Sequence, residues 1–304
     1  MKAILYVFSG TGNTRLIAEQ YQAALDLYEV RIFDVQHLQS HPEIPNPHDY
    51  ELVGFGYPVH GFNAPKIMVD FCRSLPKSGA KKTAAFIFKS SGEGLSFNRY
   101  SSQKMIRILE KKGFRFLLER HYVMPYNMIF RHTPEMVKSE WLYAKAMVRL
   151  NAAEIQNGKT ENVHTNPFKG WFVPFIRVEW LYAQLQGPAM RVDLKKCVRC
   201  MKCVESCPYD NITYTGTSFK FGMKCALCVR CSFNCPACAI SIGLLNKWRI
   251  NGSYNIKKTA ADPLVPFPYF TQELRGVKRW LYYKYYRACD AALAAAGMSV
   301  QEDE

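Results

Sequence analysis

The sequence contains no run of eighteen uncharged apolar residues and no low-complexity tract. A membrane-spanning helix needs about 20 apolar residues, so that class is excluded. A disordered chain is excluded too, because hydrophobic residues make up 48% of the sequence. The N-terminal segment has only a six-residue apolar run, without the small-residue cleavage site of a signal peptide. We therefore expect a soluble globular protein in the cytoplasm, whose 304 residues allow about two domains.

Short apolar segments alternate with helical patterns over the first half of the chain. Strands are expected at residues 3–8, 29–33, 52–57, 83–88 and 115–123, and helices at residues 13–27, 64–74, 98–112 and 134–156. The last helix has clear end signals, with Thr133 as N-cap, Pro134 at the first helical position and Asn157-Gly158 at its end. This alternation predicts an α/β fold, a doubly wound five-stranded parallel sheet with helices on both faces.

A glycine-rich loop directly follows the first expected strand and opens a helix; its residues are Ser9, Gly10, Thr11, Gly12, Asn13 and Thr14. Backbone N–H groups and the positive end of a helix dipole converge there, which suits a phosphate group. The loop lacks the lysine of a nucleoside triphosphate loop. A dinucleotide loop needs a third glycine where Arg15 stands, although Asp34 keeps that interpretation open. A terminal phosphomonoester is the third alternative, because the loop hydroxyls can donate to its oxygens.

The pattern Ser9-x-Thr11-Gly12-x-Thr14 resembles the phosphate loop of the flavodoxin family, which implies a flavodoxin-like fold and FMN. In that family the loops after strands three and four wrap the flavin ring. The resemblance assigns this role to Tyr57, Pro58, Val59, His60, Gly61 and Phe62, and to Ser90, Ser91, Gly92, Glu93 and Gly94. Tyr57, His60 and Phe62 offer rings for stacking. Plain turns remain an alternative for both loops, and His60 could be an ordinary loop histidine.

Cysteine is abundant but unevenly placed, since nine of the eleven cysteines lie between Cys197 and Cys238. They form the motif C-x2-C-x2-C-x3-C-P twice, 28 residues apart. This spacing is the known signature of proteins with two [4Fe–4S] clusters, in which the fourth cysteine of each motif ligates the other cluster. Carried over, one cluster is ligated by Cys197, Cys200, Cys203 and Cys235, and the other by Cys225, Cys228, Cys231 and Cys207.

Zinc is the alternative metal for these cysteines. A zinc site uses four ligands, usually as two pairs, and a repeated three-plus-one pattern fits it poorly. Cys238 lies outside the repeated ligand set and is not expected to ligate. Cys72 and Cys289 fall in expected helices and are interpreted as small buried residues.

The motifs divide the chain into four segments. We expect a flavodoxin-like FMN-binding domain at 1–160, an aromatic connecting segment at 161–190, a small α+β ferredoxin domain with two clusters at 191–243, and a C-terminal extension at 244–304 with a basic aromatic helix at 272–296. This combination resembles the flavodoxin–ferredoxin fusion proteins of anaerobic bacteria and archaea. The resemblance implies electron transfer between the clusters, which carry single electrons, and FMN, which takes one or two.

An FMN-dependent reductase is the alternative function. A small organic substrate would bind over the flavin beneath the connecting segment and receive electrons through the clusters. His60 or Glu93 would then deliver the proton. A flavin face sealed by Trp171 or Phe172 would argue against this alternative, and an open pocket bearing His60 would favour it.

Acidic residues are few, 25 against 40 Lys and Arg, and the formal net charge is +15. Cluster thiolates and a flavin phosphate would lower it to about +9, so the excess indicates anionic cofactors rather than nucleic acid. The expected tail helix still carries five cations, Arg275, Lys278, Arg279, Lys284 and Arg287. We expect this helix to pack through its apolar face, and redox partner proteins to present an acidic surface. Peripheral contact with a membrane is the alternative for the helix.

Overall fold

Five parallel strands form the central sheet of the computed structural model, which describes residues 1–36, 43–79, 82–165, 185–270 and 274–300. The strands are β1 (Lys2–Val7), β2 (Glu29–Asp34), β3 (Leu52–Pro58), β4 (Thr83–Ser91) and β5 (Phe114–Val123). Their order is β2-β1-β3-β4-β5, the flavodoxin-like order. The predicted α/β class is confirmed. The order reverses between β1 and β3, which opens a crevice at the carboxyl edge of the sheet.

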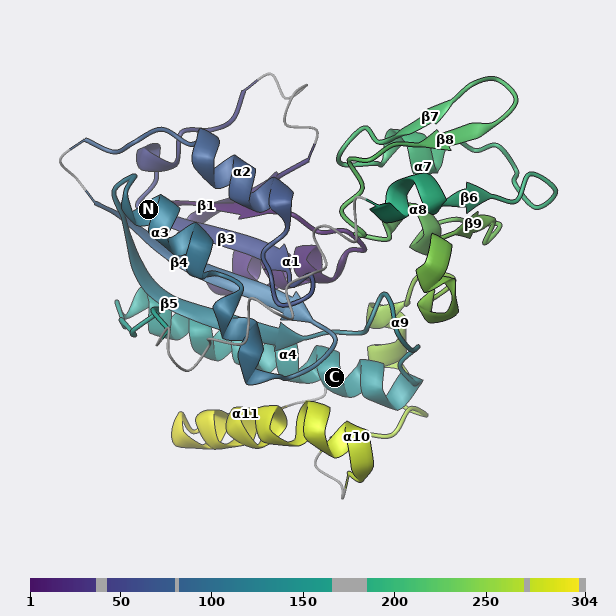
Figure 1. Cartoon of the computed structure of the whole chain (residues 1–304). Helices are drawn as coiled ribbons and strands as arrows, with labels where there is room; N and C mark the ends of the chain where they lie inside the picture. Colours follow the sequence, from purple (N-terminus) through teal and green to yellow (C-terminus); the bar gives the residue numbers. More distant parts are fainter. Residues whose placement is uncertain (37–42, 80–81, 166–184, 271–273, 301–304) are drawn as a thin grey trace.

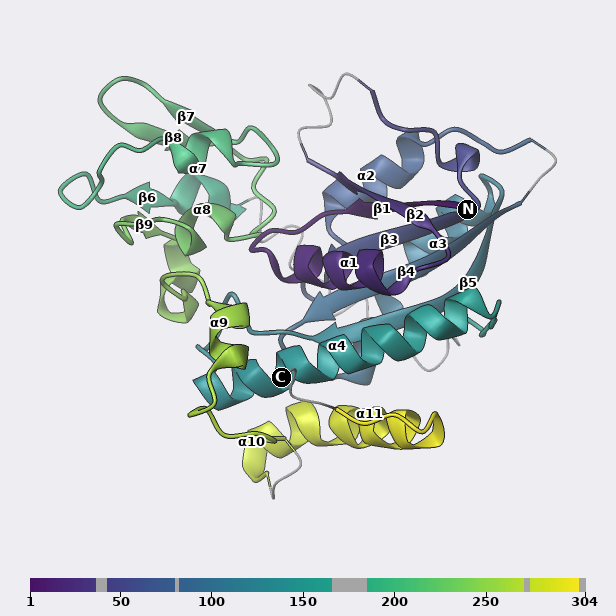
Figure 2. The same cartoon turned by 180° about the vertical axis from the view of Figure 1, so that it is seen from behind.

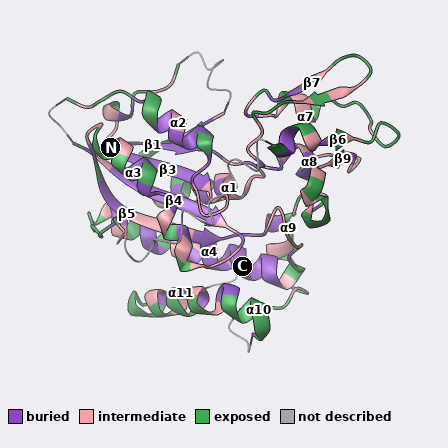
Figure 3. Ribbon diagram, viewed as in Figure 1, coloured by how far each residue is buried: buried purple, intermediate pink, exposed green. Residues whose placement is uncertain are grey.

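Helices cover both faces of the sheet (Figures 1 and 2). One face carries α1 (Asn13–Ala24) and α4 (Pro134–Gln156), and the other carries α2 (Lys66–Ser74) and α3 (Gln103–Glu110). Strand side chains alternate between the two cores, with Tyr6 and Phe55 on the α2 side and Phe86 and Phe88 on the α1 side. Figure 3 shows β1, β3 and β4 buried through most of their length, whereas the edge strand β2 has one buried residue, Phe33. Helices on both faces therefore account for the nearly continuous apolar runs of these three strands.

Three helices and one strand have clearly different bounds from the prediction. The first helix, expected to reach residue 27, ends at Ala24. Pro65 has an extended backbone, so α2 begins at Lys66 and not at residue 64. The expected helix 98–112 is divided into a 3-10 turn at Ser96–Tyr100 and the shorter α3. β4 extends to Ser91, where Ser90 pairs with Pro58 on one side and Tyr122 on the other. This extension carries the residues after position 88 to the edge of the sheet.

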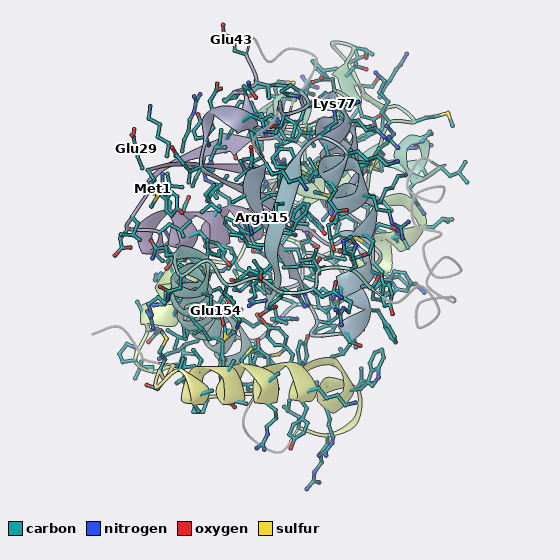
Figure 4. All side chains as sticks on the ribbon, turned by 90° about the vertical axis from the view of Figure 1, so that its left-hand side faces the viewer. Met1, Glu29, Glu43, Lys77, Arg115 and Glu154 are labelled. Atoms are coloured by element: carbon teal, nitrogen blue, oxygen red, sulfur yellow. The ribbon has the colours of Figure 1, made fainter. Side chains whose placement is uncertain are left out.

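Arg120 of β5 joins the edge strand to α4. Its guanidinium pairs with Glu154 at 2.6 Å and with Glu161 at 2.7 Å. The bidentate bonds from Arg120 hold the pKa of Glu161 down, at about 2. Figure 4 shows Glu154 on α4, with α11 below it. This network holds the chain after α4 against the sheet.

The cysteine-rich region packs beside the carboxyl edge of the sheet (Figure 1). Its strands are short: β6 (Arg191–Val192) pairs antiparallel with β9 (Ile240–Ser241), and β7 (Ile212–Tyr214) pairs with β8 (Phe219–Phe221). Two single-turn helices, α7 (Lys202–Glu205) and α8 (Arg230–Phe233), lie between them. A small core forms around Met190, Val229, Ile240 and Ile242.

The C-terminal extension runs back along α4 (Figures 1 and 2). It contains α9 (Ile256–Ala261), α10 (Gly276–Lys278), a π-helical turn at Arg279–Tyr283 and α11 (Lys284–Ala295). Tyr286 stacks on Phe270 at 4.1 Å, and Asp290 accepts a hydrogen bond from Tyr143 of α4. The helix therefore packs through its apolar face, as predicted, and all five of its expected cations are exposed. Among the described residues, no helix combines the length and the apolar character needed to cross a membrane.

Candidate functional site

The phosphate loop, residues 9–14, lies between β1 and α1. Gly12 has a φ of 103°, which favours glycine, and it directly precedes the first residue of α1. Gly12 has no side chain to cap this helix end; the Ser9 hydroxyl accepts from the N–H of Arg15 at 3.2 Å, and the N–H groups that precede Arg15 in α1 can serve an anion. The hydroxyls of Thr14 and Ser90 are 2.8 Å apart and connect the loop to the end of β4.

Arg15 and Asp34, the two residues that bear on a dinucleotide interpretation, contact each other. The Arg15 guanidinium pairs with the Asp34 carboxylate at 2.8 Å, at the surface. Asp34 is therefore engaged by a cation from α1. Arg15 also pairs with Glu19 one turn along the helix.

A pocket of about 980 Å³ opens at the carboxyl edge of the sheet, and we call it the edge pocket. The phosphate loop contributes Ser9, Gly10, Thr11, Asn13 and Thr14; the end of β3 and its following loop contribute Pro58, Val59, His60, Gly61 and Phe62; the end of β4 and its following loop contribute Ser90, Ser91, Gly92 and Glu93. The structure thus brings three loops, far apart in sequence, to one cavity. Its volume is at the upper end of the range of about 300–1,000 Å³ for small-molecule pockets.

Two residues that the resemblance assigned to the flavin ring lie elsewhere. Tyr57 is fully buried in the core, and its hydroxyl lies 3.1 Å from the Ser101 hydroxyl, so its ring is not available for stacking. Gly94 faces the C-terminal helix, where its N–H donates to the Leu281 carbonyl. A Cβ on Gly94 would collide with Tyr285. The expectation that these two residues contact the flavin ring is corrected. Tyr57 packs in the core, and Gly94, which has no Cβ, allows the tail helix to approach closely. Gly12 shapes the phosphate loop without lining the pocket.

A fourth loop, after β5, also lines the edge pocket and was missed in the sequence. It supplies Pro125, Tyr126, Asn127, Met128 and Ile129. Asn13 donates to the Pro125 carbonyl at 2.8 Å, and Asn127 donates to the Thr11 hydroxyl at 3.3 Å. The available signal was its position, because every strand of a parallel sheet delivers its following loop to the same edge.

The remaining walls come from the second half of the chain. They are Leu185, Leu227, Leu245, Trp248, Trp280 and Leu281, together with Leu95 from the first half. The Trp248 carbonyl accepts a hydrogen bond from the N–H of Ile129, which ties the C-terminal extension to the fourth loop. Trp280, on the tail helix, is 63% exposed at this pocket. The expected tail helix therefore helps to form the site. Trp171 and Phe172, expected near it, lie outside the described residues.

Burial shifts the pKa of the two titratable candidates in the pocket in opposite directions. Burial lowers the pKa of His60 to about 4, and a ring N–H bonds to the Ala226 carbonyl. His60 is thus a neutral ring at pH 7, with one nitrogen already engaged. Burial raises the pKa of Glu93, which is bonded to Tyr126 and accepts from Asn98 at 3.0 Å. Of the two, Glu93 is the better placed to carry a proton at neutral pH.

The eight motif cysteines gather around two small cavities. One is lined by Cys197, Cys200, Cys203 and Cys235, the first set; the other is lined by Cys207, Cys225, Cys228 and Cys231, the second set. Each set combines three cysteines of one motif with the fourth of the other, the crossed arrangement expected from the spacing. Cys231 lines both cavities. Over the part of the chain that is described, no three Cys, His, Asp or Glu side chains converge as tightly as a single metal ion requires.

The two motifs repeat each other in backbone as well as in sequence. Residues at equivalent positions share a left-handed conformation, in the pairs Arg199 and Leu227, Met201 and Val229, and Asp210 and Cys238. Backbone N–H groups donate to the sulfurs of Cys197 and Cys235 in the first set and of Cys225 and Cys207 in the second, at 3.3–3.4 Å. Such bonds stabilise thiolates and tune iron–sulfur centres. Cys238 occupies the position of Asp210 and lines neither cavity.

The thiols of the second set are held in an apolar setting. Burial raises the pKa of Cys228 to about 12 and raises the pKa of Cys225 and Cys231 as well. In the first set, burial raises the pKa of Cys203 to about 11. A metal core must therefore compensate the charge of these sulfurs when they become thiolates.

The cysteine-rich region and the sheet each have known counterparts. A family model described as a 4Fe-4S binding domain matches residues 190–213, which include Cys197, Cys200, Cys203 and Cys207. Flavodoxin 1 from Bacillus cereus is 16% identical, with a TM-score of 0.37, over 52% of this chain and 98% of its own. A flavodoxin from Streptococcus pneumonia TIGR4 is 17% identical, with a TM-score of 0.38, over 52% and 99%.

Another similar structure is a flavoprotein from Lactobacillus acidophilus NCFM, solved in complex with FMN. It is 13% identical, with a TM-score of 0.29, over 40% of this chain and 92% of its own. No curated protein matches the chain at a significant level. The strand order and the matched domain together identify a flavodoxin-like α/β fold joined to a 4Fe-4S ferredoxin region, the arrangement of a flavodoxin–ferredoxin fusion.

Proposed function

We propose that the protein transfers electrons between two [4Fe–4S] clusters and FMN, exchanging one- and two-electron steps in anaerobic metabolism. The observation that carries the proposal is the packing of two four-cysteine sets beside the edge pocket of a flavodoxin-like sheet. Bound FMN would supply the chemistry of accepting one or two electrons, and the clusters would supply single-electron transfer. The chain's own residues bind and orient these groups.

The edge pocket fits FMN in its polar and its apolar parts. Ser9, Thr11 and Thr14 and the N-terminus of α1 offer donors to a phosphate at one end. The rest of the lining is largely apolar and aromatic, with Phe62 and Tyr126 among the rings available to a planar group. The cysteine sets fit clusters through their four thiols and their N–H···S bonds.

Anaerobic reconstitution tests this function directly. We expect about eight iron and one FMN per chain, with an iron–sulfur absorption band that bleaches on reduction. Cys197→Ser should lower the iron content, whereas Cys238→Ser, outside both sets, should retain about eight iron. Four or fewer irons in the unmutated protein, or stoichiometric zinc, would contradict the two-cluster assignment.

A second candidate function is an FMN-dependent reductase, because the edge pocket is large and contains Glu93, whose raised pKa suits a proton donor. The test is anaerobic reduction of two probes, a small quinone and a small enone, by the reconstituted protein. A Glu93→Gln variant that retains FMN but loses at least tenfold in kcat would support the reductase. Equal rates would favour the electron carrier.

A further inference from the structure

The two cysteine motifs share one backbone geometry but face different surroundings. Between its first two cysteines the first motif has Val198, 65% exposed, and Arg199, also exposed. The second motif has Ala226 and Leu227 at the same positions, and Leu227 is only 6% exposed. Arg199 and Leu227 have φ values of 53° and 48°, so the loop conformation is the same. The difference therefore lies in what each loop packs against.

The loop between the first two cysteines of the second motif packs against the edge pocket. Leu227 lines both that pocket and the cavity of the second set. A Cβ on Gly10 of the phosphate loop would stand 2.9 Å from the Cys228 carbonyl, so the two backbones are in close contact. His60, from the loop after β3, bonds to the carbonyl of Ala226. A single residue, Leu227, thus lies between the edge pocket and the cavity of the second cysteine set.

Arg230 stabilises this contact between the second cysteine motif and the phosphate loop. Its guanidinium donates to the carbonyls of Gly10 (2.9 Å) and Ser9 (2.5 Å) in the phosphate loop. It also donates to the Gln36 side chain (2.8 Å) after β2 and to the Ser206 carbonyl (3.0 Å) beside Cys207. The rigid fork of an arginine can hold such a set of acceptors at fixed angles. At the equivalent position the first motif has Lys202, which is exposed.

The first set faces outward. Cys200 is the exposed cysteine among the eight, and the segment joining β6 to α7 stands away from the sheet in both views (Figures 1 and 2). Three exposed cations lie in this segment, Lys195, Lys196 and Arg199, and a fourth, Lys202, begins α7. The exposed acids nearby are Asp193, paired with Lys196 at 3.5 Å, and Glu205 at the end of α7. A positive rim of this kind attracts an acidic protein surface and speeds encounter.

We propose that the second set holds the cluster next to the flavin, that Arg230 is the positioning residue that fixes it there, and that the first set exchanges electrons with a one-electron protein carrier of acidic surface. This order rests on the proposed function. Two single-electron oxidations of the carrier balance the two-electron reduction of the flavin, whose protons come from water. The path runs from the carrier to the first set, to the second set and across the Leu227 contact.

Two matched variants test the order, Arg230→Gln and Lys202→Gln, at equivalent positions of the two motifs. Arg230→Gln should retain eight iron, speed amide hydrogen exchange at residues 9–12, raise the Kd for FMN at least tenfold and slow flavin reduction by the clusters. Lys202→Gln should leave exchange and the Kd for FMN unchanged. It should lower the rate of cluster reduction by a probe donor, a reduced acidic [2Fe–2S] ferredoxin, and weaken the salt dependence of that rate.

Arg230→Lys keeps the charge but not the fork, so it should behave like Arg230→Gln in hydrogen exchange. If Arg230→Gln loses iron, Gln36→Leu removes one acceptor of Arg230 without touching the cysteine region and should speed exchange in the same loop. The order would be overturned if hydrogen exchange and FMN affinity are unchanged in these position-230 and position-36 variants. It would also be overturned if Lys202→Gln shows the effects expected of Arg230→Gln and Arg230→Gln shows those expected of Lys202→Gln. Missing iron or FMN in the unmutated protein would instead refute the proposed function.

Discussion

The α-carbon of Gly10 faces the backbone carbonyl of Cys228 so closely that a Cβ would stand 2.9 Å from the oxygen. A backbone carbonyl held in the cysteine loop cannot move aside as a flexible side chain could. Gly10→Ala should therefore push the phosphate loop and the second cysteine set apart. We expect FMN to bind at least tenfold more weakly, measured by fluorescence titration. Gly79→Ala, where a Cβ meets nothing within 4 Å, is the control and should leave the Kd for FMN unchanged.

The phosphate loop could be recognised in the sequence because its signal is local. Ser9, Thr11 and Thr14 stand within one turn between a strand and a helix, and the structure places all three at the pocket. The cysteine sets were equally accessible, since ligand spacing is a property of a short loop. The fold class also followed, because the apolar runs of the strands are buried on both faces.

What the sequence did not reveal depends on contacts between distant segments. Tyr57 ends a strand as a pocket residue would, but its ring points to the core face and lies against α2 and α3 residues. Gly94 resembles a flavin-loop glycine, yet Tyr285, far along the chain, determines its surroundings. Leu227 and Trp280 reach the edge pocket only because two later segments fold back to it. No local pattern encodes such packing.

Removing a hydroxyl from the phosphate loop should weaken FMN binding alone. Thr14→Val keeps the shape of the side chain but removes the partner of Ser90 and a donor to phosphate. Because a hydrogen bond to a charged group contributes about 1.5–3 kcal/mol, we expect the Kd for FMN to rise roughly tenfold or more. Iron content, measured in the same samples, should remain that of the unmutated protein. An unchanged Kd in both Thr14→Val and Thr11→Ala would contradict the loop assignment.

Gly92 should tolerate no side chain, because a Cβ there would overlap the Tyr126 ring. Gly92→Ala must displace that ring from the wall of the edge pocket. We expect altered flavin absorbance and weaker FMN binding, with the cysteine region unaffected. Gly92→Ala combined with Tyr126→Ala should restore part of the affinity, since the space is reopened. Failure of the double variant to recover any affinity would show that Tyr126 itself is required for binding.

His60 should make the protein less stable in mild acid. Its pKa in the folded protein, about 4, lies below the value of about 6.5 of an unfolded histidine, so the unfolded chain takes up the proton first. The stability contributed by neutral His60 is full above pH 6.5 and is lost as pH falls toward 4. His60→Gln keeps a donor for Ala226 but cannot titrate. Urea unfolding at pH 7.5 and pH 5 should show that the variant loses less stability on acidification than the unmutated protein. Equal losses of stability would contradict the attribution of this loss to His60.

The buried ion pair of Lys89 and Glu119 should be strongly destabilising to break. The Lys89 ammonium is 1% exposed and donates to Glu119 at 2.5 Å and to the Asn98 carbonyl at 2.7 Å. Lys89→Met leaves the Glu119 carboxylate, 12% exposed, without its cation. Breaking one partner of such a pair costs about 3–5 kcal/mol, because the other charge stays buried.

The measurement is the urea midpoint of unfolding for the cofactor-free protein, at constant slope. Lys66→Met, which removes a surface cation paired with Asp70, is the matched control and should cost less than about 1 kcal/mol. Lys89→Met with Glu119→Leu removes both charges and should recover much of the loss, since no uncompensated ion remains. If the single and double variants unfold at the same urea concentration, the cost comes from packing around Asn98 and not from the unpaired carboxylate.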